Sequence, residues 1–267
     1  MAKSTTITKS IAPQQMEFLH FLEDEEISIF TLDQIKNTYP ENVGQINEVI
    51  ENLVDKKFLL RIERGKYCRS NFRDENVIGT FIASNSAIAY WSALNLHGLT
   101  EQFPNTIFVQ TTQKKSSKTI FGTAYQFVTI RADKRGGITY NGYGTYQYPI
   151  TDIEKTIVDC FDLPQYNGGM SELIRAFAKA DLSAEKMIDY CKMVNSVAVT
   201  KRIGFLAEFM QKKGLQPFID YAQSCIQPAV YNLFDSNGGP SGETNSRWRL
   251  YLNISSEDLT GIIEKIY

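Results

Sequence analysis

The sequence predicts an α+β fold of two domains: a small N-terminal domain of helices and one hairpin, and a larger domain that joins a small antiparallel sheet to a C-terminal helical part. Three patterns predict it. Apolar residues recur at helical spacing up to residue 54, strand-like runs lie between about 106 and 150, and amphipathic helices lie between about 151 and 226. A chain of 267 residues is long enough for two cores, and we expect the domains at 1–73 and 74–267.

Composition and charge narrow the class of protein. Apolar side chains make up 43% of the chain, aromatic ones 12% and charged ones 22%. This balance is typical of a soluble globular protein and excludes a collagenous, low-complexity or wholly disordered chain. With 28 basic and 30 acidic residues the formal net charge is -2. Any contact with nucleic acid therefore requires a local basic patch.

The first 55 residues contain three predicted helices. The first ends at a solvated acidic run, residues 23–26, and a short extended piece precedes a brief second helix over about 32–38. Pro40 ends this second helix, because the residue before a proline is pushed out of the helical region. Asn42 is predicted to cap the third helix. The apolar stripe of that helix follows the spacing i, i+3, i+4, i+7 and i+8 and consists of Ile46, Val49, Ile50, Leu53 and Val54.

A hairpin is predicted next. Two short alternating runs, residues 58–62 and 66–69, flank a turn that ends in Gly65. Three helices followed by a hairpin are the layout of a winged helix-turn-helix, in which the third helix lies in the DNA major groove and the hairpin tip approaches the phosphates. We therefore assign residues 1–73 to a winged helix-turn-helix DNA-binding domain.

The charges of this domain are distributed unevenly. Residues 56–73 carry seven basic side chains and one acid, an excess that favours salt-dependent contacts to the DNA backbone. The outward face of the third helix instead carries Glu48, Glu51 and Asp55, which are unfavourable near phosphates. The alternative is a protein–protein module whose basic run is a solvated hairpin. The predicted DNA contacts are Asn42, Gln45, Asn47, Arg61, Arg64, Lys66 and Arg69.

The segment from about 74 to 150 is predicted to form one helix and a sheet. Ser84 is expected to cap a helix that contains residues 87–94 and ends at His97. Five strand-like runs with turn residues between them predict an antiparallel sheet or a small half-barrel. Basic residues at 114–118 and 134–135 offer a second contact for a polyanion, although solvated loops are the simpler interpretation. The glycines of this region match no phosphate-binding motif and are assigned to hairpin turns.

Helices are predicted through most of the C-terminal segment. Thr151 and Glu154 have the spacing of a capping box at the start of the first helix, which Pro164 ends. Further helices are expected from near Ser183 and over about 197–213. On the polar side of the latter, Phe205 is expected to pack under the tail of the chain rather than to mark a partner surface. A strand-like run and a short final helix complete the chain.

The sequence shows no catalytic set, and we expect no enzymatic activity, cofactor or bound metal. Asp152, Glu154, Asp159 and Asp162 suggest a metal-dependent nuclease, because paired carboxylates hold magnesium, but no acid-x-lysine pattern accompanies them. The four cysteines are far apart and form no CxxC pair, which is typical of small buried side chains in a reducing cytosol. No signal peptide or membrane span is evident, so we expect a cytoplasmic protein with no membrane association.

The order of these segments resembles the AbiEi family, antitoxins of type IV toxin–antitoxin and phage-abortive-infection systems. Three stretches carry the resemblance: LLRIERGKY at 59–67, SNSAIAYWSAL at 84–94 followed by HGL at 97–99, and ITDIEKTIVDC at 150–160. Pro164, the glycine pair at 168–169 and KRIGFL at 201–206 add to it. Together they cover nearly the whole chain.

The resemblance implies a function in two parts. The winged helix would bind double-stranded DNA at inverted repeats in its own promoter and repress its own operon. The larger domain would counter a nucleotidyltransferase toxin encoded alongside, without a stable complex of the two proteins. The chain lacks the toxin's glycine-serine and paired-aspartate motif, so the resemblance implies the antitoxin. The alternatives are a winged-helix transcriptional regulator whose larger domain senses a ligand or partner, and the metal-dependent nuclease.

Overall fold

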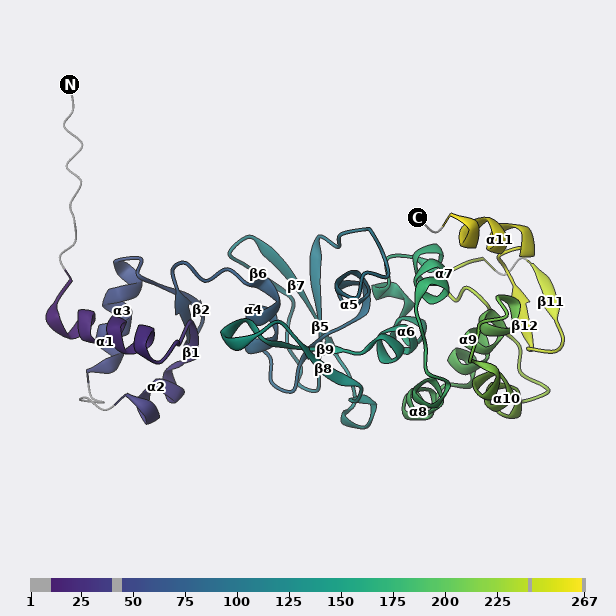
Figure 1. Cartoon of the computed structure of the whole chain (residues 1–267), viewed down its shortest axis with the longest axis horizontal. Helices are drawn as coiled ribbons and strands as arrows, with labels where there is room; N and C mark the ends of the chain where they lie inside the picture. The colour runs from purple at the N-terminus through teal and green to yellow at the C-terminus, as the bar shows by residue number, and fades with distance from the viewer. Residues whose placement is uncertain (1–10, 40–44, 240–241, 266–267) are drawn as a thin grey trace, which may run out of the picture. The chain divides into compact units, whose positions relative to one another are not determined.

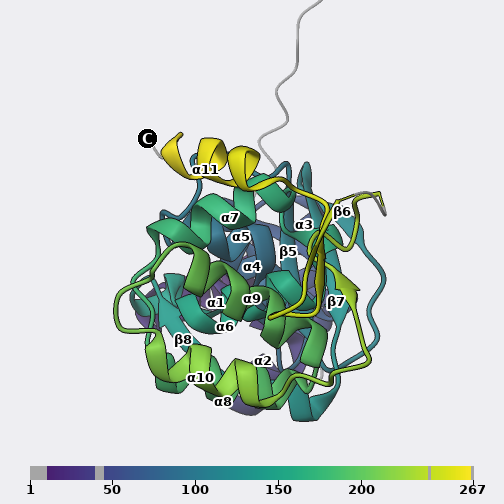
Figure 2. The ribbon, with the colours of Figure 1, turned by 90° about the vertical axis from the view of Figure 1, so that its right-hand side faces the viewer.

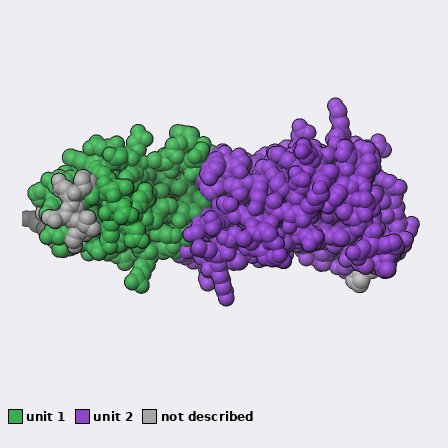
Figure 3. Space-filling view, turned by 90° about the horizontal axis from the view of Figure 1, so that it is seen from below, with its two compact units in different colours: residues 1–82, 142–147 green, residues 83–141, 148–267 purple. Residues whose placement is uncertain are grey.

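Separate hydrophobic cores divide the chain into two units. The structure is a computed structural model that describes residues 11–39, 45–239 and 242–265. Unit 1 comprises residues 1–82 and 142–147, and unit 2 comprises residues 83–141 and 148–267 (Figure 3). None of the helices in the described ranges is long and apolar enough to cross a membrane.

The core of unit 1 lies between its N-terminal helices and a small sheet. The apolar stripe of the third helix is buried in it, and Ile46, Ile50 and Leu53 are at most 2% exposed. Phe18 packs edge-on against Phe30, with ring centroids 6.1 Å apart. The elements in chain order are α1 (Pro13–Asp24), β1 (Ile29–Thr31), α2 (Leu32–Thr38), α3 (Ile46–Asp55), β2 (Leu59–Glu63), β3 (Lys66–Arg69) and α4 (Glu75–Phe81) (Figure 1).

The N-terminal predictions of local structure are confirmed. α2 and α3 cover the predicted residues, and β2 pairs antiparallel with β3 as a hairpin. β1 adds to the other side of β3, which gives the order β1-β3-β2 within the described part of unit 1. Thr31 caps α2 by accepting a hydrogen bond from the Gln34 amide at 3.0 Å. The predicted cap Asn42 lies outside the described residues, and Gln45 holds the N-cap position of α3 without a side-chain hydrogen bond.

The sheet of unit 2 is mixed, and the prediction of an antiparallel sheet is wrong. Over the described residues the strand order is β6-β7-β5-β4-β9-β8. β6 lies at the edge and forms a hairpin with β7, so β7 returns beside β5 in the same direction and pairs with it in parallel. Its strands are β4 (Ala87–Ile88), β5 (Thr106–Thr111), β6 (Lys118–Ile120), β7 (Thr123–Thr129), β8 (Ile138–Asn141) and β9 (Tyr148–Thr151).

The predicted start of the next helix at Ser84 is also wrong, whereas its predicted end at His97 is confirmed. Ala87 and Ile88 form β4, which pairs with β5 on one side and β9 on the other, and both side chains are fully buried. Helix α5 begins only at Tyr90. Ser84 caps no helix, and its carbonyl accepts a hydrogen bond from the Thr111 hydroxyl at 2.7 Å. Two adjacent apolar residues fit the sequence pattern of a helix and that of a buried strand equally well. Here the pairing with β5 and β9 favours the strand.

The capping box predicted at Thr151 is wrong, and the cap of α6 lies one residue later. Thr151 is the last residue of β9, and Asp152 caps α6 by accepting from the Lys155 amide at 2.9 Å. Glu154 turns away from the cap and accepts from the Ser183 amide at 2.9 Å. A carboxylate caps as well as a hydroxyl does, and strand pairing of Thr151 moves the helix start to Asp152.

The helices of unit 2 bury the larger core. Phe205 packs against Phe234 of the C-terminal tail with ring centroids 5.1 Å apart, as predicted. Figure 2 shows α11 lying along α7. The remaining elements are α5 (Tyr90–Leu96), α6 (Ile153–Asp162), α7 (Met170–Lys179), α8 (Ala184–Val194), α9 (Val197–Phe209), α10 (Gln216–Ser224), β10 (Asn232–Leu233), β11 (Glu243–Asn245), β12 (Leu250–Leu252) and α11 (Ser256–Glu264).

Candidate nucleic-acid interface

One hollow of about 280 Å³ on unit 1 gathers several of the predicted contacts. It lies between α3 and the turn of the β2–β3 hairpin. Its lining includes two arginines and an asparagine, residue types that contact phosphates and base edges, together with one acid. The lining residues are Leu32, Asn47, Glu51, Arg61, Arg64, Gly65 and Tyr67.

Local structure explains how these side chains meet. Because α3 buries Ile46 and Ile50, Asn47 lies on its exposed side. The hairpin register places Arg61 of β2 opposite Tyr67 of β3. Gly65 has a φ of 73°, a left-handed conformation that glycine adopts without strain and that closes the turn next to Arg64.

Arg61 is engaged by an acid of α3. Its guanidinium forms an ion pair with the Glu51 carboxylate, and the Tyr67 hydroxyl donates to the same carboxylate at 2.9 Å. Burial raises the pKa of the Tyr67 hydroxyl, and the hydrogen bond to Glu51 adds to the rise. Both charged side chains are 46% exposed, so the pair is of the solvated kind that contributes little to stability. A phosphate can therefore compete for Arg61.

Lys66 points toward the end of α4. Its ammonium donates to the carbonyls of Ile82 at 2.9 Å and Phe81 at 3.3 Å. It also pairs with Glu63 at 3.1 Å and lies 5.7 Å from the centre of the Phe81 ring. These contacts give Lys66 a structural role, because they anchor the hairpin to the end of α4.

The remaining predicted DNA contacts do not all line the hollow between α3 and the hairpin turn. Gln45, Asn47 and Arg64 are exposed, and within the described part of the chain Arg64 has no ion-pair partner. Arg69 is half-buried and lines a separate hollow beside α1. The structure thus brings Asn47, Arg61 and Arg64 together and leaves Arg69 apart from them, and Asn42 lies outside the described residues.

The acidic residues that suggested a nuclease are bound to cationic side chains in unit 2. Asp159 pairs with Lys155, and Asp162 pairs with Lys134 at 2.7 Å. Asp152 and Glu154 both accept from the ammonium of Lys186, at 3.1 and 3.3 Å. Across the described residues no group of histidine, cysteine, aspartate and glutamate side chains has the arrangement of a metal site.

Asp159 lies among these acids and is the most strongly perturbed of them. Burial raises its pKa to about 6, and neighbouring Lys155 opposes the rise. One of its carboxylate oxygens and the hydroxyl of Tyr90 are buried and have no hydrogen-bond partner in the described part of the chain. Tyr90 itself has a φ of 56°, which is rare for a residue other than glycine, asparagine or aspartate. Asp159 and Tyr90 therefore belong to the core of unit 2.

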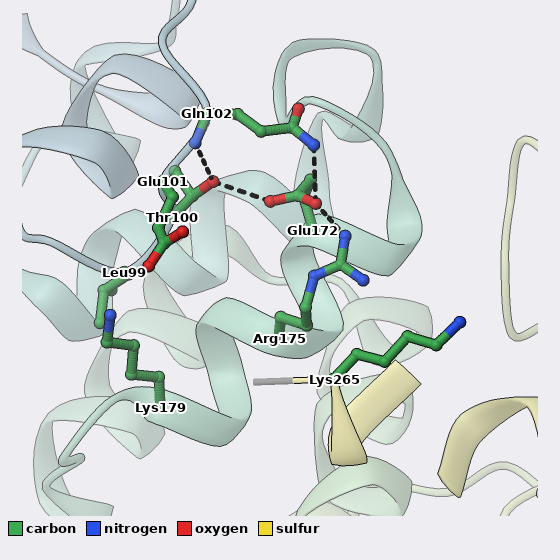
Figure 4. Close-up of a pocket in the computed structure, with 8 residues that line it drawn as sticks. All are labelled: Leu99, Thr100, Glu101, Gln102, Glu172, Arg175, Lys179 and Lys265. Atoms are coloured by element: carbon green, nitrogen blue, oxygen red, sulfur yellow. Dashed lines mark hydrogen bonds and ion pairs between the residues drawn. The ribbon is translucent and has the colours of Figure 1, made fainter. Parts of the chain in front are cut away.

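Sequence patterns did not single out a second hollow, which lies in unit 2 between the loop at 99–102, α7 and α11 (Figure 4). Its central group is the buried carboxylate of Glu172, which pairs with Arg175. The only sequence signal is the spacing of three residues between these opposite charges on one helix. Such pairs are common on solvated helices, and so this one carried no prediction.

Comparison with known proteins extends to the fold alone. No protein-family model and no curated protein matches the chain. The crystal structure of the Rv2827c protein from Mycobacterium tuberculosis matches with a TM-score of 0.65, over 96% of this chain and 96% of that one. The two proteins share the fold. At 13% sequence identity the similarity to Rv2827c carries no inference about function.

Proposed function

We propose that unit 1 is a winged helix-turn-helix that binds double-stranded DNA, and that the chain is an autorepressor and the antitoxin of a type IV toxin–antitoxin pair. The order of three helices and a hairpin supports the DNA-binding part. The resemblance of three sequence stretches to the AbiEi family supports the antitoxin part.

The hollow between α3 and the hairpin turn carries the proposal. Asn47 presents an amide, which is a good partner for adenine in the major groove. Arg61 and Arg64 present guanidinium groups, which bind phosphates through paired donors. α3 then supplies base contacts and the hairpin supplies backbone contacts, as in other winged helices.

Glu51 of α3 must release Arg61 before the guanidinium can bind a phosphate. Phosphate must displace Glu51 from Arg61, and the displaced carboxylate remains close to the DNA. We therefore expect Arg64, which is exposed and has no ion-pair partner among the described residues, to contribute more of the backbone affinity than Arg61. Lys66 supports the hairpin and is not part of the proposed contact set.

Fluorescence anisotropy with the duplex upstream of the protein's own gene tests DNA binding. We expect Arg64→Glu to weaken binding and to reduce the slope of log affinity against log salt by about 1 or more. Lys213→Glu, an exposed position in unit 2, is the matched control and should bind like the wild type. Equal weak binding of wild type and Arg64→Glu to any duplex would contradict the proposal.

Co-expression tests the antitoxin part. A nucleotidyltransferase encoded beside this gene should arrest growth when expressed alone, and the full chain should restore growth. A neighbouring gene of another class, or the absence of rescue, would favour the regulator whose larger domain senses a ligand or partner.

A further inference from the structure

The hollow of unit 2 at α7 has a volume of about 270 Å³ and is lined by both charged and polar side chains. Three segments far apart in the sequence build it: the loop after α5, the exposed side of α7 and the end of α11 (Figure 4). The lining residues are Leu99, Thr100, Glu101, Gln102, Glu172, Arg175, Lys179 and Lys265.

Glu172 organises this site. Its carboxylate is 7% exposed and accepts from the Thr100 hydroxyl at 2.7 Å and from the Gln102 side-chain amide at 2.9 Å. It also pairs with Arg175. Both carboxylate oxygens are therefore occupied, so Glu172 is not available to bind a cation. Its contacts hold the loop and the guanidinium in place before any ligand arrives.

The remaining charges are mostly positive. Arg175 and Lys179 lie four residues apart on one face of α7, and Lys265 follows α11, which packs on α7. Figure 4 shows Lys179 and Lys265 on either side of Arg175, each with its ammonium group directed away from the guanidinium. Three cations (Arg175, Lys179, Lys265) against two acids (Glu101, Glu172) leave a net charge of +1. In the described ranges neither lysine has an ion-pair partner.

We propose that this hollow binds a small metabolite that carries a phosphate monoester. Among the described residues the Arg175 guanidinium bonds only to Glu172, and two exposed lysine side chains line the same hollow. Together they offer donors and charge of the kind that a phosphate dianion requires. The volume is just below the range of about 300–1,000 Å³ for small-molecule sites, which suits a compact ligand. The site is independent of the proposed DNA interface, whose residues belong to unit 1.

Isothermal titration of the full chain at constant ionic strength tests the proposal, with glycerol 3-phosphate as the probe and succinate as the carboxylate comparison. We expect saturable binding of glycerol 3-phosphate at one site and weaker binding of succinate. The double variant Lys179→Glu plus Lys265→Glu should weaken binding about a hundredfold, because each of the two lost charge-assisted bonds costs about 1.5 kcal/mol, or about tenfold. Lys213→Glu should bind like the wild type.

Other outcomes overturn the proposal. No saturable binding at millimolar probe rejects the site, and equal affinity for succinate rejects the phosphate class. Unchanged affinity in the double variant rejects the location. Both lysines are exposed, so circular dichroism should show an unchanged fold, and the milder variant Lys179→Ala plus Lys265→Ala gives a second measurement if it does not. DNA affinity measured on the same variants should equal that of the wild type.

Discussion

Arg61 of β2 and Glu51 of α3 form an ion pair that joins the hairpin to the third helix. The pair lies in the hollow that Asn47 and Arg64 also line. The ion pair with Glu51 therefore orients the Arg61 guanidinium and also offsets its positive charge. For this reason substitutions at either residue should change the affinity of unit 1 for DNA.

Glu51→Gln should strengthen DNA binding. The substitution removes a carboxylate that repels phosphate and releases Arg61, while the amide oxygen still accepts from the Tyr67 hydroxyl. We expect affinity for the upstream duplex to rise roughly fivefold at low salt, with a smaller gain at high salt. Anisotropy titrations at several salt concentrations measure the effect. Glu243→Gln, an exposed position in unit 2, is the control, and weaker binding by Glu51→Gln would reject the assigned role of Arg61.

Lys66→Met should loosen the hairpin. The ammonium donates to two backbone carbonyls at the end of α4, and a charged donor of this kind contributes about 1.5–3 kcal/mol. We expect faster hydrogen–deuterium exchange in peptides that cover residues 59–69. Arg64→Met on the same hairpin is the matched control, because its side chain is exposed, and its exchange should match that of the wild type. Equal exchange in both variants would show that the Lys66 contacts do not anchor the hairpin.

Asp159 should make the stability of unit 2 depend on pH. Its pKa is raised from 3.8 to about 6 in the folded protein, so between these values the folded state binds more protons than the unfolded state. Stability should therefore fall as pH rises from about 4 to about 6. Asp159→Asn removes this contribution. The free energy of unfolding of the variant, minus that of the wild type, should therefore increase as pH rises over the same range. Urea titrations followed by the fluorescence of the two tryptophans, Trp91 and Trp248, which both lie in unit 2, measure both free energies. Parallel pH profiles would contradict the assignment.

Gly204→Ala should destabilise the C-terminal core. A methyl group at Gly204 would lie 2.4 Å from the buried ring of Trp248 and 2.8 Å from the methyl group of Ala222. Overpacking of this kind costs about 1–3 kcal/mol. Gly261→Ala in α11 is the control, since outside the backbone of α11 itself no described residue comes within 4 Å of its added methyl group. That variant should be stabilised by about 0.5–1 kcal/mol. Urea unfolding of both variants gives the comparison.

Sequence alone determined the local structure of the N-terminal region. The apolar stripe of residues 46–54 and the glycine turn at residue 65 depend on near neighbours in the chain, and the structure confirms both the helix and the hairpin. Phe205 was also placed correctly, because a large aromatic side chain gains free energy by packing under the tail.

Tertiary structure decided the features that depend on residues far apart in the chain. Ala87 and Ile88 became a strand because two distant strands flank them, and Thr151 ended a strand where its pattern suggested a cap. The ion pair of Arg61 with Glu51 and the contacts of Glu172 likewise join separate segments. Sequence periodicity records which residues are apolar and how they are spaced. Only the folded chain shows which strand pairs with which and which charge meets which, because those energies arise from contacts between distant residues.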